Sequence, residues 1–250
     1  MNSESNSTSP KQPPTAAFDL YANSYDGGID NPLKKCVGGD ALSFIEVKVD
    51  WLLARLAREL RPPEPGAAVR LLDYGCGVST FLHVLRRRAF SGDLAGCDVS
   101  QEMLNEGRKR WNQGPLPDLA WMEGLSAPFA DGAFDVIVVS AVLHHIAPED
   151  RGRTYADLLR LLRRGGRIYV FEHNPFNPLT QWVVRHSPID ENAVLLRPSE
   201  VRLGLGRAGA SAVRTDYIMF TPPRLRFLRP IDKALAWLPL GGQYVVSAGA

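Results

Sequence analysis

The feature that most constrains the fold is a hydrophobic period that changes repeatedly along residues 69–172. Short apolar runs, typical of buried strands, alternate there with amphipathic segments of about ten residues, typical of helices. The run 134–139 is almost wholly apolar, as expected of a central strand that is covered on both faces. Strands joined by helices of this length need crossover connections, which give a parallel sheet. The pattern therefore predicts a doubly wound α/β core.

Element boundaries follow from the same pattern and from helix-ending signals. Asp40 suits an N-cap for a first helix that ends at the pair Pro62 and Pro63. The strands are expected at 69–74, 93–98, 119–123, 134–139, 167–171, 213–220 and 243–247. Further helices are expected at 79–88, 101–111, 149–162 and 199–208. The last two strands are predicted to complete the sheet edge as a hairpin-like pair, with residues 222–238 crossing over between them. The sheet is thus seven-stranded and mostly parallel, with an antiparallel edge strand.

The chain outside this core differs in composition. Residues 1–17 are mostly Ser, Asn, Thr and Pro, so we expect a disordered tail, with no signal peptide. Residues 18–66 are expected to form an N-terminal helical cap, and residues 67–250 the main domain. Within that domain a proline-rich insert at about 174–198 is expected to cover the substrate. No apolar run is long enough to span a bilayer.

Charge and cysteine usage exclude several classes of function. The net charge of +2 is too small to imply a nucleic-acid partner. The cysteines, Cys36, Cys76 and Cys97, are odd in number and lack Cys-x-x-Cys or Cys/His ligand spacing. We therefore expect neither a disulfide framework nor a structural zinc site, and a reducing cytoplasm fits best.

The turn after the first strand carries the strongest functional signal. Gly75 and Gly77 allow the backbone to pass close to a ligand, and the following helix points free N–H groups at that space. A dinucleotide fingerprint requires a third glycine, and Thr80 stands there instead. Asp73 at the strand tip would repel a pyrophosphate but attract an ammonium and a sulfonium. The charge therefore favours a cationic nucleoside that bears an amino acid.

These residues resemble the class I S-adenosylmethionine (SAM)-dependent methyltransferases, a family with a Rossmann-like fold. Asp73, Gly75, Cys76 and Gly77 resemble the family's first motif, whose turn holds the methionine half of SAM. Asp98, at the end of the second predicted strand, corresponds to the acid that binds both ribose hydroxyls. A carboxylate that accepts two hydroxyl hydrogen bonds explains why an acid is needed there.

The resemblance also implies contacts with the adenine. Val99 and Met103 would pack on the ring. Glu123 and Gly124 fall where the family places an acid and a backbone N–H that read the adenine edge. The family's usual acid at this position is Asp, so the Glu is a departure.

On the methionine side, the resemblance implies that Ser140 begins a loop under the methionine chain and that Tyr21 and Tyr25 close over SAM. Ser79 stands where the family usually has a third glycine, and we expect it to act as the N-cap of the following helix. SAM is thus the expected cofactor and S-adenosylhomocysteine the product, with no metal expected.

Catalysis of in-line methyl transfer needs alignment of donor and acceptor and exclusion of water. A hydroxyl acceptor also needs a base, for which His144, His145 and His173 are the candidates, since imidazole titrates near neutral pH. For each of them a buried, hydrogen-bonded structural role explains the residue about as well.

The acceptor is expected to be a small molecule, methylated on an oxygen, nitrogen or carbon atom. Methyltransferases that act on base amines carry an Asn/Asp-Pro-Pro-aromatic tetrapeptide after the fourth strand, and this chain has Ser-Ala-Val-Leu at 140–143. The stretches 174–178 and 238–244 resemble a bacterial subset of the family without a fixed substrate. Stable membrane insertion is not expected. The basic segment 224–229 fits a solvated helix face better than a membrane contact. A homodimer is left open. Two alternatives remain, an NAD(P)-dependent oxidoreductase and a catalytically silent SAM-binding protein.

Overall fold

A computed structural model of the chain describes residues 19, 41–59, 68–190, 193–222 and 226–250. The strands are β1 (Arg70–Tyr74), β2 (Asp93–Asp98), β3 (Asp118–Trp121), β4 (Phe134–Ser140), β5 (Leu162–His173), β6 (Ser211–Ile218) and β7 (Gln243–Gly249). The helices are α4 (Ala41–Glu59), α5 (Thr80–Arg87), α6 (Gln101–Arg110), α7 (Arg151–Leu161), α8 (Pro178–Arg185), α9 (Pro198–Arg207) and α10 (Arg229–Ala234). Short 3-10 turns are η2 (Leu143–His145), η3 (Pro188–Asp190) and η4 (Arg226–Leu228).

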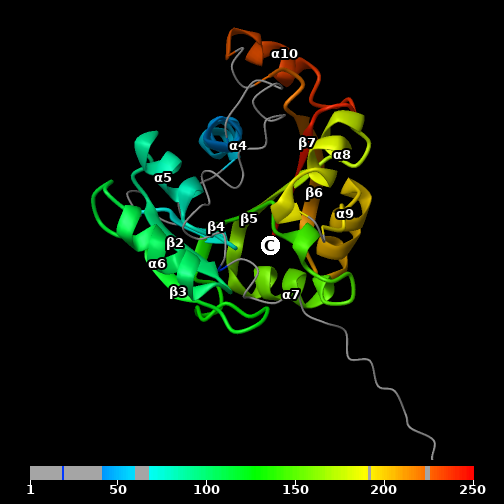
Figure 1. Cartoon of the computed structure of the whole chain (residues 1–250). Coiled ribbons are helices and arrows are strands. Elements are labelled where there is room, and N and C mark those ends of the chain that lie inside the picture. The colour runs from blue at the N-terminus through cyan, green and yellow to red at the C-terminus, as the bar shows by residue number, and fades with distance from the viewer. Residues whose placement is uncertain (1–18, 20–40, 60–67, 191–192, 223–225) are drawn as a thin grey trace, which may run out of the picture.

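The strands form one seven-stranded sheet in the order β3-β2-β1-β4-β5-β7-β6 (Figure 1). The pairs among β1 to β5 are parallel, and β7 runs antiparallel to both β5 and β6. The predicted doubly wound, mostly parallel sheet is thus confirmed, with the last two strands completing its edge. The strand order reverses between β1 and β4, which is where a ligand binds in such sheets.

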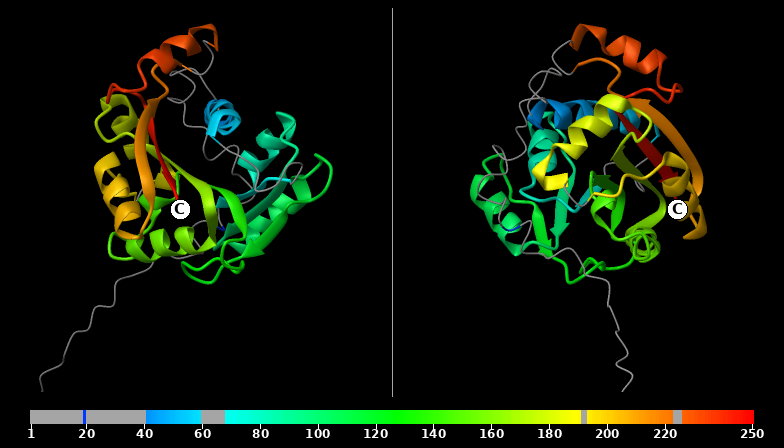
Figure 2. Two further views of the ribbon diagram at one scale, coloured as in Figure 1. Left: turned by 180° about the vertical axis from the view of Figure 1, so that it is seen from behind. Right: turned by 45° about the vertical axis from the view of Figure 1, so that its right-hand side comes forward.

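Helices cover both faces of the sheet (Figure 2). Val136 and Val138 of β4 pack with α4 and α5 on one face, while Ile137 and Val139 pack with α7 and α9 on the other. All four side chains have no exposed surface. Because alternate side chains of a strand point to opposite faces, the uninterrupted apolar run of β4 follows from burial on both sides.

Helix α4 belongs to this core. Val49 and Leu52 are fully buried in it, and the Trp51 ring meets Tyr169 and Phe171 edge-on at centroid distances of 6.0 and 5.7 Å. The division of the chain into tail, cap and main domain stays a prediction, and Asp40 lies outside the described residues. Within the described ranges, no helix combines the length and the apolar character that a membrane crossing requires.

The predictions for Ser79 and for the start of β5 differ from the structure, and β6 begins and ends two residues before the predicted 213–220. Ser79 is not a side-chain N-cap: its φ of 63° is left-handed, and its hydroxyl makes no capping hydrogen bond to α5. Strand β5 begins at Leu162, directly after α7, rather than at 167, because Leu162 pairs with Phe134 before a bulge. Leu162 is 4% exposed, so burial favours the extended backbone here.

The insert contains a helix that the sequence pattern did not reveal. Asn177 caps α8 by accepting a hydrogen bond from the Thr180 N–H at 3.0 Å, and Pro178 occupies the first turn. Asn174 is fully buried and donates to the carbonyls of Pro239 and Gly241 at 3.1 and 2.7 Å. The two stretches that suggested a bacterial subset therefore lie against each other.

Candidate functional site

Four of the predicted site residues lie at one edge of the sheet. Asp73 is near the end of β1, Asp98 ends β2, Ser140 ends β4 and His173 ends β5. These four strands are parallel, so their carboxyl ends face the same side. This is the position that the sequence predicted for a ligand.

The turn between β1 and α5 is fixed by backbone hydrogen bonds. The N–H groups of Gly75 and Cys76 both donate to the Cys97 carbonyl, at 2.8 and 2.9 Å. Gly75 has a φ of +77°, and a Cβ there would lie 2.5 Å from a methyl group of Val142. Glycine is therefore required at 75 by backbone conformation and by space.

Asp98 is tied to this turn. Its Oδ2 accepts from the Gly77 N–H at 2.8 Å and its Oδ1 from the Ser100 N–H at 2.9 Å. Burial raises the pKa of Asp98 despite these two hydrogen bonds. A carboxylate offers about four lone-pair sites, so Asp98 keeps capacity to accept from a ribose hydroxyl.

Asp73 is 2% exposed. Burial, reinforced by the charge of Asp98, raises the pKa of Asp73 to about 7, and the charge of Lys48 opposes that rise. Lys48 comes from α4, is 5% exposed, and donates to Ser140 Oγ at 2.9 Å. Lys48 was not among the predicted site residues. Its signal was its spacing, since Ile45, Val49 and Leu52 put it on the apolar face of the helix.

On the adenine side the predicted residues differ in exposure. Met103 is 2% exposed and Val99 packs partly against the core. Strand β3 ends at Trp121, so Glu123 and Gly124 lie beyond it and are exposed, rather than ending the strand at 123 as predicted. The Trp121 indole N–H donates to the Val99 carbonyl at 2.9 Å, which ties the ends of β2 and β3 together.

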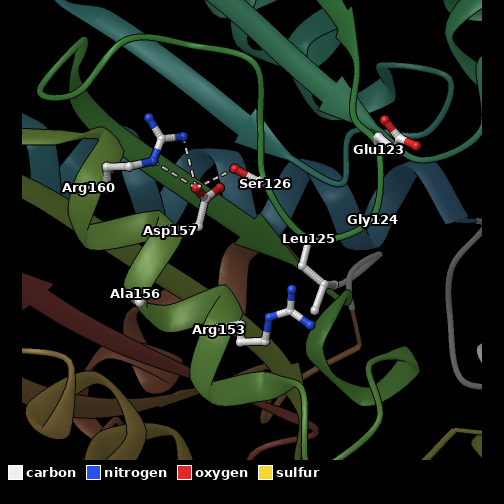
Figure 3. A pocket seen from close by; sticks show the side chains of 8 residues that line it. All are labelled: Glu123, Gly124, Leu125, Ser126, Arg153, Ala156, Asp157 and Arg160. Atoms are coloured by element: carbon white, nitrogen blue, oxygen red, sulfur yellow. Dashed lines mark hydrogen bonds and ion pairs between the residues drawn. The ribbon is translucent and has the colours of Figure 1, made fainter. Parts of the chain in front are cut away.

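A cavity of about 450 Å³ lies between the loop after β3 and helix α7 (Figure 3). It is lined by Glu123, Gly124, Leu125, Ser126, Arg153, Ala156, Asp157 and Arg160. Arg160 donates to Asp157, to Asp131 and to two main-chain carbonyls, which is the pattern of a structural arginine. Neither Asp73 nor Asp98 lines this cavity, so it is not the hollow that those acids mark out.

The three predicted histidines come together beside the end of β5. The His144 ring lies 4.1 Å from that of His145 and 5.2 Å from that of His173, between centroids. His144 Nδ1 is 2.5 Å from Glu172 Oε2, and His144 Nε2 is 3.5 Å from Asp190 Oδ1. His144 and Glu172 are both 1% exposed. We call these five residues the histidine cluster.

Glu172 and Asp190 set the charge of this cluster. Burial disfavours the charged form of His144, but the charges of Glu172 and Asp190 outweigh it and raise the pKa of His144 to about 9. Burial, reinforced by the charge of His144, lowers the pKa of His145 to about 4 and that of His173 to about 3. The Glu172 carboxylate also accepts from the N–H groups of Val142 and Leu143, at 3.2 and 2.8 Å. Asp190 lies in η3, where no periodic pattern pointed to it.

Two groups of predictions remain. Tyr21 and Tyr25 lie outside the described residues; Asp19, just before them, accepts a hydrogen bond from the Ser100 hydroxyl at 2.5 Å. Cys76 and Cys97 are buried, and burial raises the pKa of both thiols, which leaves them protonated and unsuited to nucleophilic attack.

Known proteins share this sequence pattern and fold. Residues 72–170 match a family described as a methyltransferase domain. The chain is 31% identical over 169 residues to the ubiquinone/menaquinone biosynthesis C-methyltransferase UbiE of Cereibacter sphaeroides. The aligned region covers 66% of this chain and 61% of that protein. It is 32% identical over 162 residues to the demethylmenaquinone methyltransferase of Beutenbergia cavernae, covering 64% of this chain and 62% of that protein.

Among solved structures, the fold matches that of a Thermotoga maritima SAM-dependent methyltransferase, described as a possible histamine N-methyltransferase. The TM-score is 0.64 at 16% identity, and the match covers 94% of this chain and 98% of that chain. This likeness concerns the fold. The chain spans 61% and 62% of the length of the two curated relatives above. Residues 72–170 thus carry the sequence pattern of a methyltransferase domain, on a fold that the Thermotoga maritima structure shares.

Proposed function

We propose that this chain transfers the methyl group of SAM to a small molecule bound beside the histidine cluster. The observation that carries the proposal is the pair of acids, the buried Asp73 and the partly buried Asp98, at the tips of adjacent strands on either side of a glycine turn. A carboxylate buried as deeply as Asp73 is stabilised by a cationic partner, and the SAM ammonium supplies one. The remaining lone pairs of Asp98 suit the ribose hydroxyls.

In this proposal the residues of the chain bind and orient. Asp73 holds the amino group, Asp98 holds the ribose, and the Gly75–Gly77 turn lets the backbone approach the methionine half. SAM supplies the activated methyl group. Most of the rate enhancement comes from aligning the acceptor with that methyl group and excluding water.

The acceptor side is proposed to lie at the ends of β4 and β5. There the histidine cluster provides polar groups for an acceptor oxygen or nitrogen, and the insert that carries α8 and η3 brings Asp190 to it. His145 is better placed than His144 to meet an acceptor, because its side chain is 19% exposed while that of His144 is 1% exposed. The curated relatives are named for quinone biosynthesis, so hydroxylated aromatic rings are the acceptors to assay first.

The test is calorimetric titration of the purified full chain with SAM, S-adenosylhomocysteine and NAD. We expect SAM and S-adenosylhomocysteine to bind at one site per chain and NAD to give no heat. Asp98→Asn should weaken SAM binding by about tenfold to a hundredfold, since hydrogen bonds to a charged group contribute about 1.5–3 kcal/mol.

Asp93→Asn is the matched control. Asp93 begins the same strand that Asp98 ends and is exposed, so this change should leave SAM affinity unaltered. NAD binding without SAM binding would favour the oxidoreductase alternative. SAM binding with no turnover on any acceptor would favour the silent SAM-binding protein.

A further inference from the structure

The histidine cluster contains a buried nitrogen that no hydrogen bond explains. His144 Nε2 is inaccessible to solvent and has no hydrogen-bond partner among the described residues. It points towards Asp190 Oδ1, but the 3.5 Å between them exceeds an ordinary hydrogen bond. The nitrogen and the carboxylate therefore form a long ion pair rather than a short hydrogen bond.

The other ring nitrogen of His144 is fully engaged. Its Nδ1 lies 2.5 Å from Glu172 Oε2, and Glu172 is itself held by two main-chain N–H groups. This contact occupies Nδ1 and leaves Nε2 facing Asp190, where a bound metal ion would displace the Nε2 proton. A carboxylate on the far nitrogen of an imidazole is the usual support of a metal-binding histidine.

The spacing also suits a metal ion. His144, His173 and Asp190 each offer one ligand atom, and these atoms all lie within 4.8 Å of one another. Bonds of about 2.0–2.1 Å to a tetrahedral ion place neighbouring ligand atoms about 3.4 Å apart. The separation of 3.5 Å between His144 Nε2 and Asp190 Oδ1 is close to that value.

The two buried carboxylates of the histidine cluster also favour a metal ion. Glu172 and Asp190 are both buried, at 1% and 8% exposure, and both flank one imidazole. A proton on His144 would balance one of these two carboxylates, whereas a divalent ion would balance both. Buried charges are tolerated when they are paired or bind a metal.

We propose that His144, His173 and Asp190 bind a divalent first-row transition ion of the zinc or ferrous type. Two imidazoles and one carboxylate favour such an ion over Mg²⁺ or Ca²⁺, which prefer oxygen ligands alone. Three protein ligands leave a coordination position open. As an extension that depends on the proposed methyl transfer, this open position takes an oxygen of the acceptor and orients it towards the methyl donor.

The test is a titration of the full chain, stripped of metal by a chelator, with Co²⁺ followed by visible absorption. Co²⁺ is the probe because its bands strengthen when it leaves octahedral water for a site of lower coordination number. We expect one Co²⁺ per chain, displaced by Zn²⁺. Asp190→Asn and His144→Ala should weaken binding by at least a hundredfold, and Glu172→Gln, which contacts His144 through Nδ1 and is not a proposed ligand, by about tenfold to a hundredfold.

His83→Gln is the matched control. His83 also has a buried Nε2 without a hydrogen-bond partner, but its ring lies 4.5 Å from that of Trp111, and the charges acting on it come from Arg87 and Arg110. This variant should bind Co²⁺ as the unaltered chain does. Circular dichroism checks that every variant is folded, and the conservative Asp190→Asn decides the matter should His144→Ala fail to fold.

Failure to bind Co²⁺ would overturn the proposal, and so would binding that Asp190→Asn and His144→Ala leave unchanged. SAM titration of the metal-free chain separates this result from the proposed function. Asp73 and Asp98 lie on β1 and β2, so SAM should bind whether or not the metal is present. Metal binding without SAM binding would contradict the proposed function alone.

Discussion

At the scale of single residues, the raised pKa of Asp73 couples ligand binding to pH. Burial and the charge of Asp98 raise that pKa to about 7, while the ligand ammonium favours the ionised carboxylate. SAM affinity should therefore rise between about pH 6 and about pH 7.5, and binding in this range should release a proton. Calorimetry in buffers of different ionisation enthalpy measures both effects.

The folding stability of the ligand-free protein depends on pH in the opposite direction to SAM affinity. A folded-state pKa above the unfolded value gives stability that is present at low pH and lost as the pH rises through about 7. Asp73→Asn removes the titrating group, so both pH dependences should flatten in that variant. A proton release that persists in Asp73→Asn would assign the effect to another residue.

Gly75 gives a second prediction at this scale. Gly75→Ala places a methyl group 2.5 Å from Val142 at a φ of +77°, so it should lower both the free energy of unfolding and SAM affinity. The conformation alone costs about 1–2 kcal/mol, and the clash adds to it. Gly124→Ala is the control for stability, because Gly124 has a φ of +68° but nothing within 4 Å of the added carbon. Equal losses in urea denaturation would contradict the assigned close approach.

Residues differ in how far the sequence could identify them. Asp73 and Asp98 were predictable because each lies at the end of a recognisable apolar strand. The spacing of apolar residues in α4 indicated that Lys48 lies on the buried face of the helix. No pattern in the sequence indicated Asp190, because it lies in the irregular segment between α8 and α9 that brings it to His144. Long-range contacts of this kind depend on tertiary packing that local patterns do not encode.

At the scale of elements, the packing of α9 on α7 gives a matched pair of variants. A Cβ on Gly204 would lie 2.1 Å from the Tyr155 ring, whereas a Cβ on Gly206 would meet nothing within 4 Å. Gly204→Ala should therefore destabilise the fold by about 1–3 kcal/mol. Gly206→Ala should be neutral or stabilise it by up to about 1 kcal/mol, the difference in helix propensity. Urea denaturation measures both, and a loss at 206 equal to that at 204 would refute the α7–α9 contact.

Elements with a strong period were predicted closely, as β1, β2 and β4 show. Helix α8 was missed because it lies in the proline-rich insert, although Asn177 followed by Pro178 is a helix-start signal. The predicted start of β5 was late because Arg163 to Gly166 resembles a helix end. Pairing of Leu162 with Phe134 overrides that local signal.

At the scale of the whole molecule, the sheet was predictable because crossover connections restrict the order of strands. The position of β7 between β5 and β6 follows from that logic only once the final two strands are known to be antiparallel. The same layout brings four strand tips to one edge, so a binding site there follows from the topology. The identity of the acceptor does not, because it depends on side chains contributed by the insert.

The most direct test of ligand binding by Asp73 and Asp98 is a crystal structure of the full chain with S-adenosylhomocysteine. The Asp98 carboxylate should accept hydrogen bonds from both ribose hydroxyls, and Asp73 should face the amino group of the ligand across the Gly75–Gly77 turn. Electron density for the nucleoside in the cavity beside Arg160, with both carboxylates turned away from it, would contradict the account.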